Sequence, residues 1–217
     1  MSKRLAKKDY FHQKEFALNS QYENTPTLET ERLLLRKFDE KDIEAVYRLY
    51  KDKEVNTFLP LFPLNSKNEA VELLKEKYLK AYKNSRGYKY AICMKTDFEP
   101  IGYVIVSMDE SHDLGYALIK EFWHRGFITE AVKAVIKRIK IDGLAYITAT
   151  HDVNNTRSGQ VMRKVGMRYC YTYEELWKPK NISVHFRLYQ LNLDGCTDRV
   201  YQGYWNKYKK HYVEQNI

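Results

Sequence analysis

The segment from Trp123 to Ala131 constrains the fold of this chain more than any other part of its sequence. The hydrophobic stretch from Leu114 to Leu118 before it predicts a short strand, and the amphipathic pattern after it predicts a helix. The first amides of a helix lack an intrahelical partner and the helix dipole adds partial positive charge, so an anion can bind there. Gly126 leaves space where a bulky ligand would touch the backbone. Seen alone, however, the segment fits an ordinary strand-to-helix turn better than a binding site.

The composition describes one soluble globular domain with terminal extensions. The chain has 217 residues, of which 44% are hydrophobic and 30% charged, and single domains commonly run to about 200 residues. No apolar run approaches the ~20 residues that span a bilayer. No apolar stretch follows the charged N-terminus, so neither a membrane segment nor a secretory signal is expected. The cysteines Cys93, Cys170 and Cys196 lack metal-ligand spacing and two lie in strand-like segments, which indicates reduced thiols in a cytoplasmic protein.

The formal net charge of +9 favours anionic ligands without identifying them. Most basic residues at helical spacing are expected on solvated outer faces: Lys75, Lys77, Lys80, Lys83, Lys133, Lys137, Arg138 and Lys140. A protein that reads nucleic acid would concentrate its basic residues on one element, and no known signature of that kind appears. No specific nucleic-acid partner is therefore expected, and a small ligand rich in phosphate fits the charge at least as well.

The hydrophobic periodicity predicts a mixed α/β fold in which helices cover both faces of a sheet. Residues 1–27 form a basic polar leader, residues 28–195 the folded domain, and residues 196–217 an aromatic-rich extension. Strands are expected near 28–38, 88–94, 101–107, 114–118, 144–149, 167–176 and 182–191, and helices near 39–50, 65–79, 129–141 and 156–165. Asp39 is expected to cap the first helix, and Asn65 or Ser66 the second. The apolar loop from Phe58 to Pro63 is either a lid or a packed connection.

Two sequence blocks together resemble the GCN5-related N-acetyltransferases, in particular the branch that modifies ribosomal-protein N-termini and related amines. The first block is Leu114–Leu118 with Phe122–Ala131, and the second is Asn155–Ser158 with Val161–Met167. The family's order, spacing and intervening helix are all reproduced, and Thr30–Arg36 is similar to the usual opening strand of that branch. The resemblance implies a central mixed, mostly antiparallel sheet of about seven strands with helices on both faces. It also implies acetyl-CoA as the acetyl donor and a primary amine as the acceptor.

The resemblance assigns residues to acetyl-CoA binding. The family's pyrophosphate loop corresponds to Trp123, His124, Arg125, Gly126, Phe127 and Ile128, and the amides near Arg125 to Thr129 would surround the phosphates. The strand that splays from its neighbour and bonds the pantetheine arm corresponds to Tyr116, Ala117 and Leu118. Asn155 and Ser158 match the polar pair that holds the distal pantetheine and the thiol. A long, neutral amide ligand is well held by backbone edges, which agrees with this assignment.

Three residues depart from the family pattern. Ile128 stands where many members have Gly or Ala, and its β-branched side chain adds bulk beside the loop. Arg163 replaces a frequent glutamate. Met162 occupies the position of the tyrosine that serves as general acid in several members, and methionine cannot donate a proton. Protonation of the leaving thiolate is then left to Ser158, to a nearby tyrosine or to solvent.

Asp113 and Glu130 are the candidates for the base that removes the ammonium proton of the acceptor. Asp113 precedes the core strand and would lie near the thioester, although a solvated loop carboxylate is the plainer interpretation. Glu130 lies in the first helical turn, where the dipole favours a carboxylate and capping explains it better. A water chain to a distant carboxylate is a third route. His112, His124 and His151 lack metal-ligand spacing, so no metal is expected.

The extension after residue 195 is expected to be helical, because its aromatic residues would share one helical face: Tyr201, Tyr204, Trp205, Tyr208 and Tyr212. Packing of that face on the domain is the favoured interpretation, and a homodimer contact or a wall of the acceptor site are the alternatives.

Two other functions stay open beside that of an acetyltransferase. The first is a non-catalytic acyl-CoA-binding module, which Met162 permits. The second is a ribosome- or RNA-associated protein that uses the basic leader, Lys3, Arg4, Lys7 and Lys8. Salt-sensitive RNA binding would indicate the second of these.

Overall fold

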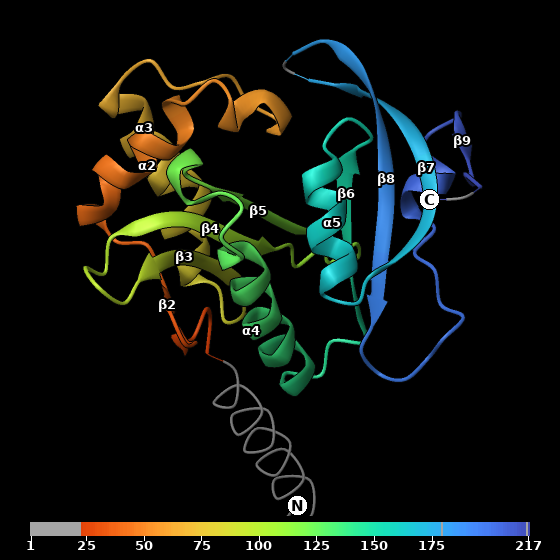
Figure 1. Cartoon of the computed structure of the whole chain (residues 1–217), viewed down its shortest axis with the longest axis horizontal. Helices are drawn as coiled ribbons and strands as arrows, with labels where there is room; N and C mark the ends of the chain where they lie inside the picture. Colours follow the sequence, from red (N-terminus) through yellow and green to blue (C-terminus); the bar gives the residue numbers. More distant parts are fainter. Residues whose placement is uncertain (1–22, 179, 216) are drawn as a thin grey trace, which may run out of the picture.

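The computed structural model describes residues 23–178, 180–215 and 217, so the expected leader lies mostly outside the described residues. Figure 1 shows two separate sheets with helices packed around them. The first sheet is antiparallel and holds five strands in chain order: β1 (Leu28–Glu29), β2 (Leu33–Arg36), β3 (Tyr88–Met94), β4 (Pro100–Val106) and β5 (Leu114–Leu118). The strand expected over 28–38 is a hairpin instead, closed where the Thr30 amide donates to the Leu33 carbonyl and the Leu33 amide donates to the Thr30 hydroxyl, each at 3.0 Å.

Helices cover both faces of the five-stranded sheet, as the amphipathic patterns predict. On one face lie α2 (Ile43–Lys51), α3 (Lys67–Leu74) and a π-helical turn that continues α3, η3 (Lys75–Leu79). The other face is covered by α4 (Phe127–Ile141), whose buried stripe packs into the main core.

The helix starts confirm two predicted caps. Asp39 forms a capping box with Asp42 in the short 3-10 turn that leads into α2. Ser66 caps α3 by accepting from the amide of Glu69. Such caps satisfy amide donors that the helix itself leaves unpaired, which is why local sequence alone locates these two boundaries.

The second sheet has four strands in the order β6-β8-β7-β9: β6 (Tyr146–Asp152), β8 (Ile182–Asn192), β7 (Arg168–Trp177) and β9 (His211–Tyr212). The helix α5 (Thr156–Lys164) follows β6 and contacts both that strand and α4. All strand pairs within both sheets are antiparallel. The expected fold class is confirmed.

The two sheets join at one point and then separate. The bridge between Asp113, immediately before β5, and Thr148 of β6 is the only strand pairing that links the two sheets among the described residues. Beyond it the two strands diverge, with α4 and α5 side by side next to the divergence (Figure 1). The edge of β5 that faces β6 is therefore left without strand partners, which agrees with the splay that the family resemblance implies.

The C-terminal extension is not the single helix that its aromatic spacing predicts. It forms a five-residue helix, α6 (Gly203–Lys207), and then β9, which pairs with β7. Tyr204, Trp205 and Tyr208 pack against the second sheet, whereas Tyr212 is exposed. The expectation of one shared helical face is therefore wrong, because strand pairing takes over after residue 208.

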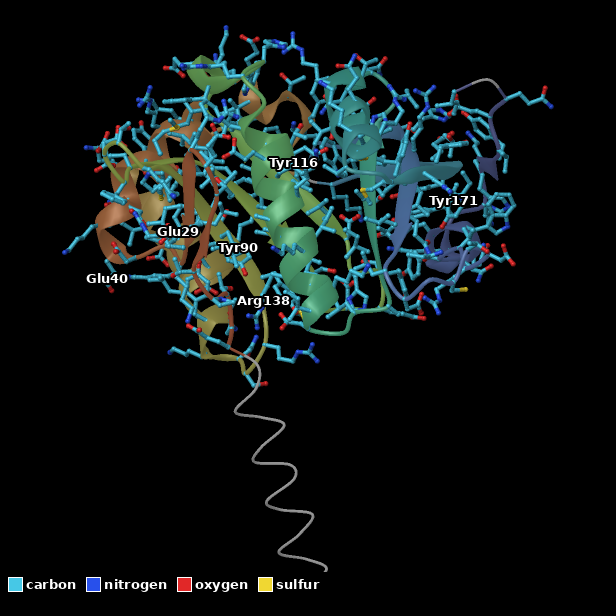
Figure 2. The ribbon with its side chains drawn as sticks, turned by 60° about the horizontal axis from the view of Figure 1, so that its bottom comes forward. Glu29, Glu40, Tyr90, Tyr116, Arg138 and Tyr171 are labelled. Atoms are coloured by element: carbon cyan, nitrogen blue, oxygen red, sulfur yellow. The ribbon has the colours of Figure 1, made fainter. Side chains whose placement is uncertain are left out.

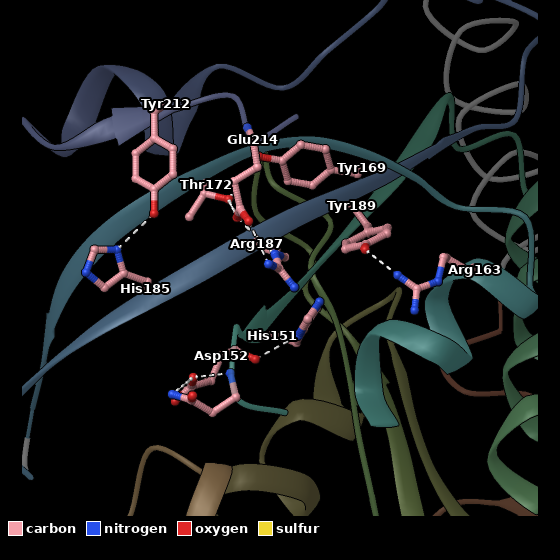
Figure 3. Close-up of polar contacts among 11 residues, drawn as sticks. His151, Asp152, Arg163, Tyr169, Thr172, His185, Arg187, Tyr189, Tyr212 and Glu214 are labelled. Atoms are coloured by element: carbon pink, nitrogen blue, oxygen red, sulfur yellow. Dashed lines mark hydrogen bonds and ion pairs between the residues drawn. The ribbon is translucent and has the colours of Figure 1, made fainter. Parts of the chain in front are cut away.

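A polar clamp holds the end of the extension in place (Figure 3). The Glu214 carboxylate accepts from Arg187 Nε at 2.9 Å and from Arg187 Nη2 at 2.6 Å, and it also accepts from the Thr172 hydroxyl. The Glu214 amide donates to the Tyr169 hydroxyl at 2.9 Å. Bidentate pairing of a carboxylate with arginine fixes geometry as well as adding energy, so the extension has a defined path over β7 and β8.

Candidate functional site

A cleft of about 1030 Å³ opens where the two sheets diverge. On its helix side it is lined by the starts of α4 and α5, including Phe127–Thr129 and Asn155–Ser158. On its far side it is lined by Asp113, by Tyr173 and Glu175 of β7, by Tyr204 and Tyr208 of the extension, and by Lys77, Tyr103 and Ile105. Phe58, Leu59 and Pro60 of the apolar loop also line it, so that loop forms part of a wall.

The helix side has the geometry of an anion site. Gly126 precedes α4 with φ of +80°, a left-handed conformation that favours glycine. The first backbone bond of the helix runs from the Glu130 amide to the Gly126 carbonyl, so the amides of residues 127–129 are those that a helix start leaves free. A Cβ at Gly126 would meet no protein atom closer than 3.6 Å, which leaves its outer side open for a ligand. Arg125 is exposed next to this turn.

The start of α5 brings together three of the expected residues. Asn155 caps the helix by accepting from the Ser158 amide at 3.3 Å. Tyr116 of β5, labelled in Figure 2, contacts this turn: its hydroxyl lies 2.9 Å from Ser158 Oγ and donates to the Ser158 carbonyl at 3.0 Å. Burial raises the pKa of Tyr116, against the opposing effect of its bond to Ser158. The phenol is therefore a neutral proton donor throughout the physiological range.

Met162 lies one turn further along α5 and is 1% exposed, packed into the main core. It carries no proton to give, whereas the hydroxyl pair of Tyr116 and Ser158 lines this end of the cleft and can donate one.

Asp113 is a carboxyl group whose surroundings favour its protonated form. Burial in the cleft raises its pKa to about 7, and repulsion from Asp109 and Glu175 adds to this, whereas a 3.4 Å contact from the Thr148 hydroxyl opposes it. The interpretation of Asp113 as a solvated loop carboxylate is thus wrong. A carboxyl with a pKa near 7 can take and release a proton at neutral pH, which suits a general base.

Glu130, the other expected base, is placed differently. It lies outside the cleft lining, and its carboxylate accepts from the Thr30 hydroxyl at 2.6 Å, from the Arg32 amide at 3.0 Å and from Arg32 Nε at 2.7 Å. Partial burial opposes ionisation, but these bonds outweigh it and lower the pKa of Glu130. A carboxylate with both oxygens engaged and a lowered pKa is a poor base. The structure therefore supports the structural role, in which Glu130 fastens α4 to the β1–β2 turn.

The far side contains Tyr173 and Lys77, which the sequence did not single out for the site, and also Tyr204 and Tyr208, for which a wall of the acceptor site was an alternative. The ring of Tyr173 stacks on those of Tyr204 and Tyr208, with centroids 5.0 and 4.9 Å away, and these two rings are themselves 6.3 Å apart. The extension therefore packs on the domain, as favoured, and at the same time walls the cleft. Lys77, expected on a solvated face, instead lines the cleft and is half-buried. Only the three-dimensional path of the extension and the π-helical turn bring these residues together.

The part of the chain that the structure describes contains no group of His, Cys, Asp and Glu side chains able to hold a metal ion. His151 is buried beside Gly159 of α5, and its Nδ1 lies 2.7 Å from the Asp152 carbonyl (Figure 3). Burial lowers the pKa of His151, so it is a neutral packed side chain. None of the helices among the described residues is both long and apolar enough to cross a membrane.

Comparison with known proteins gives consistent matches. The acetyltransferase (GNAT) domain family matches residues 32–168. The chain is 27% identical over 148 residues to the uncharacterized N-acetyltransferase YoaA of Bacillus subtilis (strain 168), a match that covers 66% of this chain and 83% of YoaA.

Solved structures share the fold. An acetyltransferase (GNAT family) from Bacillus anthracis superposes with a TM-score of 0.67 at 24% identity, covering 78% of this chain and 99% of that protein. The ribosomal L7/L12 α-N-protein acetyltransferase RimL, solved with coenzyme A, superposes with a TM-score of 0.69 at 18% identity, covering 79% of this chain and all of RimL.

Proposed function

Because the chain belongs to the GNAT acetyltransferase family, we propose that it moves the acetyl group of acetyl-CoA directly to a primary amine. The acceptor is a protein N-terminus, a peptide or a small-molecule amine. One observation carries the proposal: a helix-start anion site and a carboxyl group with a pKa near 7 lie in the same cleft. The RimL structure, whose protein acts on the N-terminus of a ribosomal protein, supports a peptide amine as one acceptor class.

The residues on the helix side fit acetyl-CoA. The amides of residues 127–129 would hold the pyrophosphate, since free amides and the helix dipole both favour anions there. The unpaired edge of β5, from Tyr116 to Leu118, would bond the pantetheine amides, with Asn155 and Ser158 at its distal end. Trp123, His124, Arg125 and Ile128 would line the loop, as the resemblance implies. When bound, acetyl-CoA supplies an activated acyl group and a thiolate leaving group.

The chain's own residues then have distinct roles on the two faces of β5. Strand alternation places Asp113, Gly115 and Ala117 on the face that carries α2 and α3, and Tyr116 on the face of α4. Asp113, on the far side of the cleft, would accept the proton that the amine releases. Tyr116, with Ser158, would hold a proton for the thiolate on the helix side. Fixing both groups around one reaction centre supplies much of the catalysis, because positioning lowers the entropic part of the barrier.

Tyr116→Phe is expected to lower kcat by about 10-fold, less than the ~100-fold or more that is usual for a general acid, because Ser158 still offers a proton. The equilibrium dissociation constant of acetyl-CoA should change little, since the ring stays in place. Ser158→Ala is the matched single variant, and the double variant should lose more than either. Stopped-flow measurement of thiol release gives kcat. Full activity of the double variant would show that solvent protonates the thiolate.

The proposal itself is tested by incubating the protein with acetyl-CoA and a panel of primary amines, with a thiol reagent to detect free coenzyme A. Amine-dependent thiol release, with the acetylated amine seen by mass spectrometry, is the expected result. Binding of acetyl-CoA without thiol release for any amine would favour the non-catalytic acyl-CoA-binding module, and absence of coenzyme A binding would overturn the proposal.

A further inference from the structure

Lys77 lies on the same side of the five-stranded sheet as the proposed base. Its ammonium group is 4.7 Å from the centroid of the Tyr103 ring, and Tyr103 of β4 is paired with Ala117 of β5. Tyr103 and Ala117 share the face covered by α2 and α3, which is the face that strand alternation gives to Asp113. Lys77, Asp113 and Tyr103 also line one cleft. The lysine therefore faces the part of the cleft that an acceptor would occupy.

No carboxylate pairs with Lys77 among the described residues. Its ammonium donates to the Tyr50 hydroxyl at 3.0 Å and lies over the rings of Tyr50, Tyr78 and Tyr103. The charged group that influences it most is another cation, Lys89, whose Nζ donates to the Lys77 carbonyl. Aromatic faces stabilise a buried cation only in part, and charges removed from water are usually paired. Lys77 thus has room for an anionic partner that the protein does not provide.

The backbone at this lysine departs from a regular α-helix. Lys77 lies in η3, the π-helical turn that follows α3, and such turns occur often at functional sites. Burial, together with repulsion from Lys89, lowers the pKa of Lys77 to about 8. A charged Lys77 at neutral pH therefore lowers the free energy of unfolding. An anionic ligand beside its ammonium group would offset this loss of stability.

The far side of the cleft, which holds Lys77, also holds the carboxyl groups of Asp113 and Glu175. An acceptor bound there meets carboxyl groups as well as an ammonium. We propose that Lys77 binds a carboxylate of the acceptor, so that the substrate is an amino acid, peptide or related molecule whose primary amine lies toward Asp113. A single lysine suits a monoanionic carboxylate, whereas phosphate is usually held by arginine or by several donors. This inference rests on the proposed acetyltransferase function.

The test compares matched acceptors that differ in one group. Glycine, β-alanine, 4-aminobutanoate, 5-aminopentanoate and glycylglycine are each paired with their primary carboxamide, and kcat/KM is measured by thiol release. The wild-type protein should prefer the acid in at least one pair. Lys77→Met should cut that acid-to-amide ratio about 10-fold or more, the loss expected for a charged hydrogen bond. The loss should appear in KM of the acid, with the amide unaffected. Because each pair also differs in amine pKa, the change of the ratio between variants is the deciding quantity.

Matched variants separate this role from folding. Lys77→Arg should keep most of the preference, and Lys80→Met, which removes an exposed lysine paired with Glu76 at the next turn, should leave it unchanged. Both Lys77 variants should bind coenzyme A as the wild type does, since Lys77 is not on the helix side. An equal acid-to-amide ratio in the wild type and Lys77→Met would overturn the inference.

Other outcomes are equally decisive. If every amide is preferred, or if none of the pairs reacts while 2-phenylethylamine, which carries no carboxylate, does, the inference fails and the proposed function stands. If no amine at all releases thiol although acetyl-CoA binds, the proposed function fails and the inference fails with it.

Discussion

Asp113→Asn is expected to lower kcat/KM by about 100-fold or more, the usual contribution of a positioned general base. Because the pKa of Asp113 is raised to about 7, the wild-type kcat/KM should rise as the pH increases through about 7 and then level off. The base acts only when it is ionised, so activity belongs to the alkaline side of this transition. In the variant the rise should disappear. Initial rates of thiol release between pH 5.5 and 9, at subsaturating amine, measure both effects.

Stability measurements on the same variant distinguish lost chemistry from lost folding. A carboxyl whose pKa is higher in the folded than in the unfolded chain destabilises the fold as it ionises, between its unfolded value near 3.9 and its folded value of about 7. The wild type should therefore lose stability relative to Asp113→Asn across that interval, and the variant should melt at the higher temperature at pH 8. Asp97→Asn, which changes an exposed carboxylate in the β3–β4 turn, should alter neither profile. A normal pH profile in Asp113→Asn would exclude Asp113 as the base.

Gly126→Val is expected to weaken binding of coenzyme A by about 10-fold or more, the effect of losing roughly 1.4 kcal/mol or more of binding energy. Valine disfavours the left-handed conformation at φ +80°, and its side chain would occupy the open space next to Gly126, at the start of α4. Both effects disturb the backbone that would hold the phosphates. Isothermal titration with coenzyme A measures the change, and dephospho-coenzyme A should show the same loss, because the pyrophosphate is common to both ligands.

Gly143 provides a matched control for this substitution. It also has a left-handed backbone, with φ of +78°, and an added Cβ would meet no atom within 4 Å. The Gly143→Val variant therefore measures the effect of backbone strain alone, which should lower the free energy of unfolding by about 1–3 kcal/mol. Both valine variants should unfold more easily by similar amounts, but only Gly126→Val should lose affinity for coenzyme A. Equal affinity in the two variants would mean that the start of α4 does not hold the phosphates.

The parts of the site that the sequence predicted are those specified by neighbouring residues. The turn before α4 and the Asn155 cap of α5 depend on a glycine with positive φ and on a side chain that reaches its own helix. Both signals act within a few residues, so they are visible in the sequence. The role of Glu130 was hidden because its partners, Thr30 and Arg32, lie about 100 positions earlier in the chain.

Lys77 shows a second reason why the sequence did not predict part of the site. It follows Ala70 by seven residues and Leu74 by three, which places it on the buried stripe of α3, yet its charge suggested a solvated face. The helical spacing was the better guide, and the aromatic rings that surround the ammonium come from α2 and β4, which no local pattern connects to it. The raised pKa of Asp113 likewise depends on its burial at the point where the two sheets meet, a property of the whole fold.

The path of the C-terminal extension links the lining of the cleft to the shielding of a sheet edge. β9 lies along β7 at the edge of the four-stranded sheet, and an uncovered edge strand invites pairing with other chains. The same extension presents Tyr204 and Tyr208 to the cleft, and Glu214 fastens it to Arg187. Changes that adapt this segment to another acceptor therefore also alter how well the sheet edge is shielded, so substrate range and resistance to aggregation would be expected to evolve together.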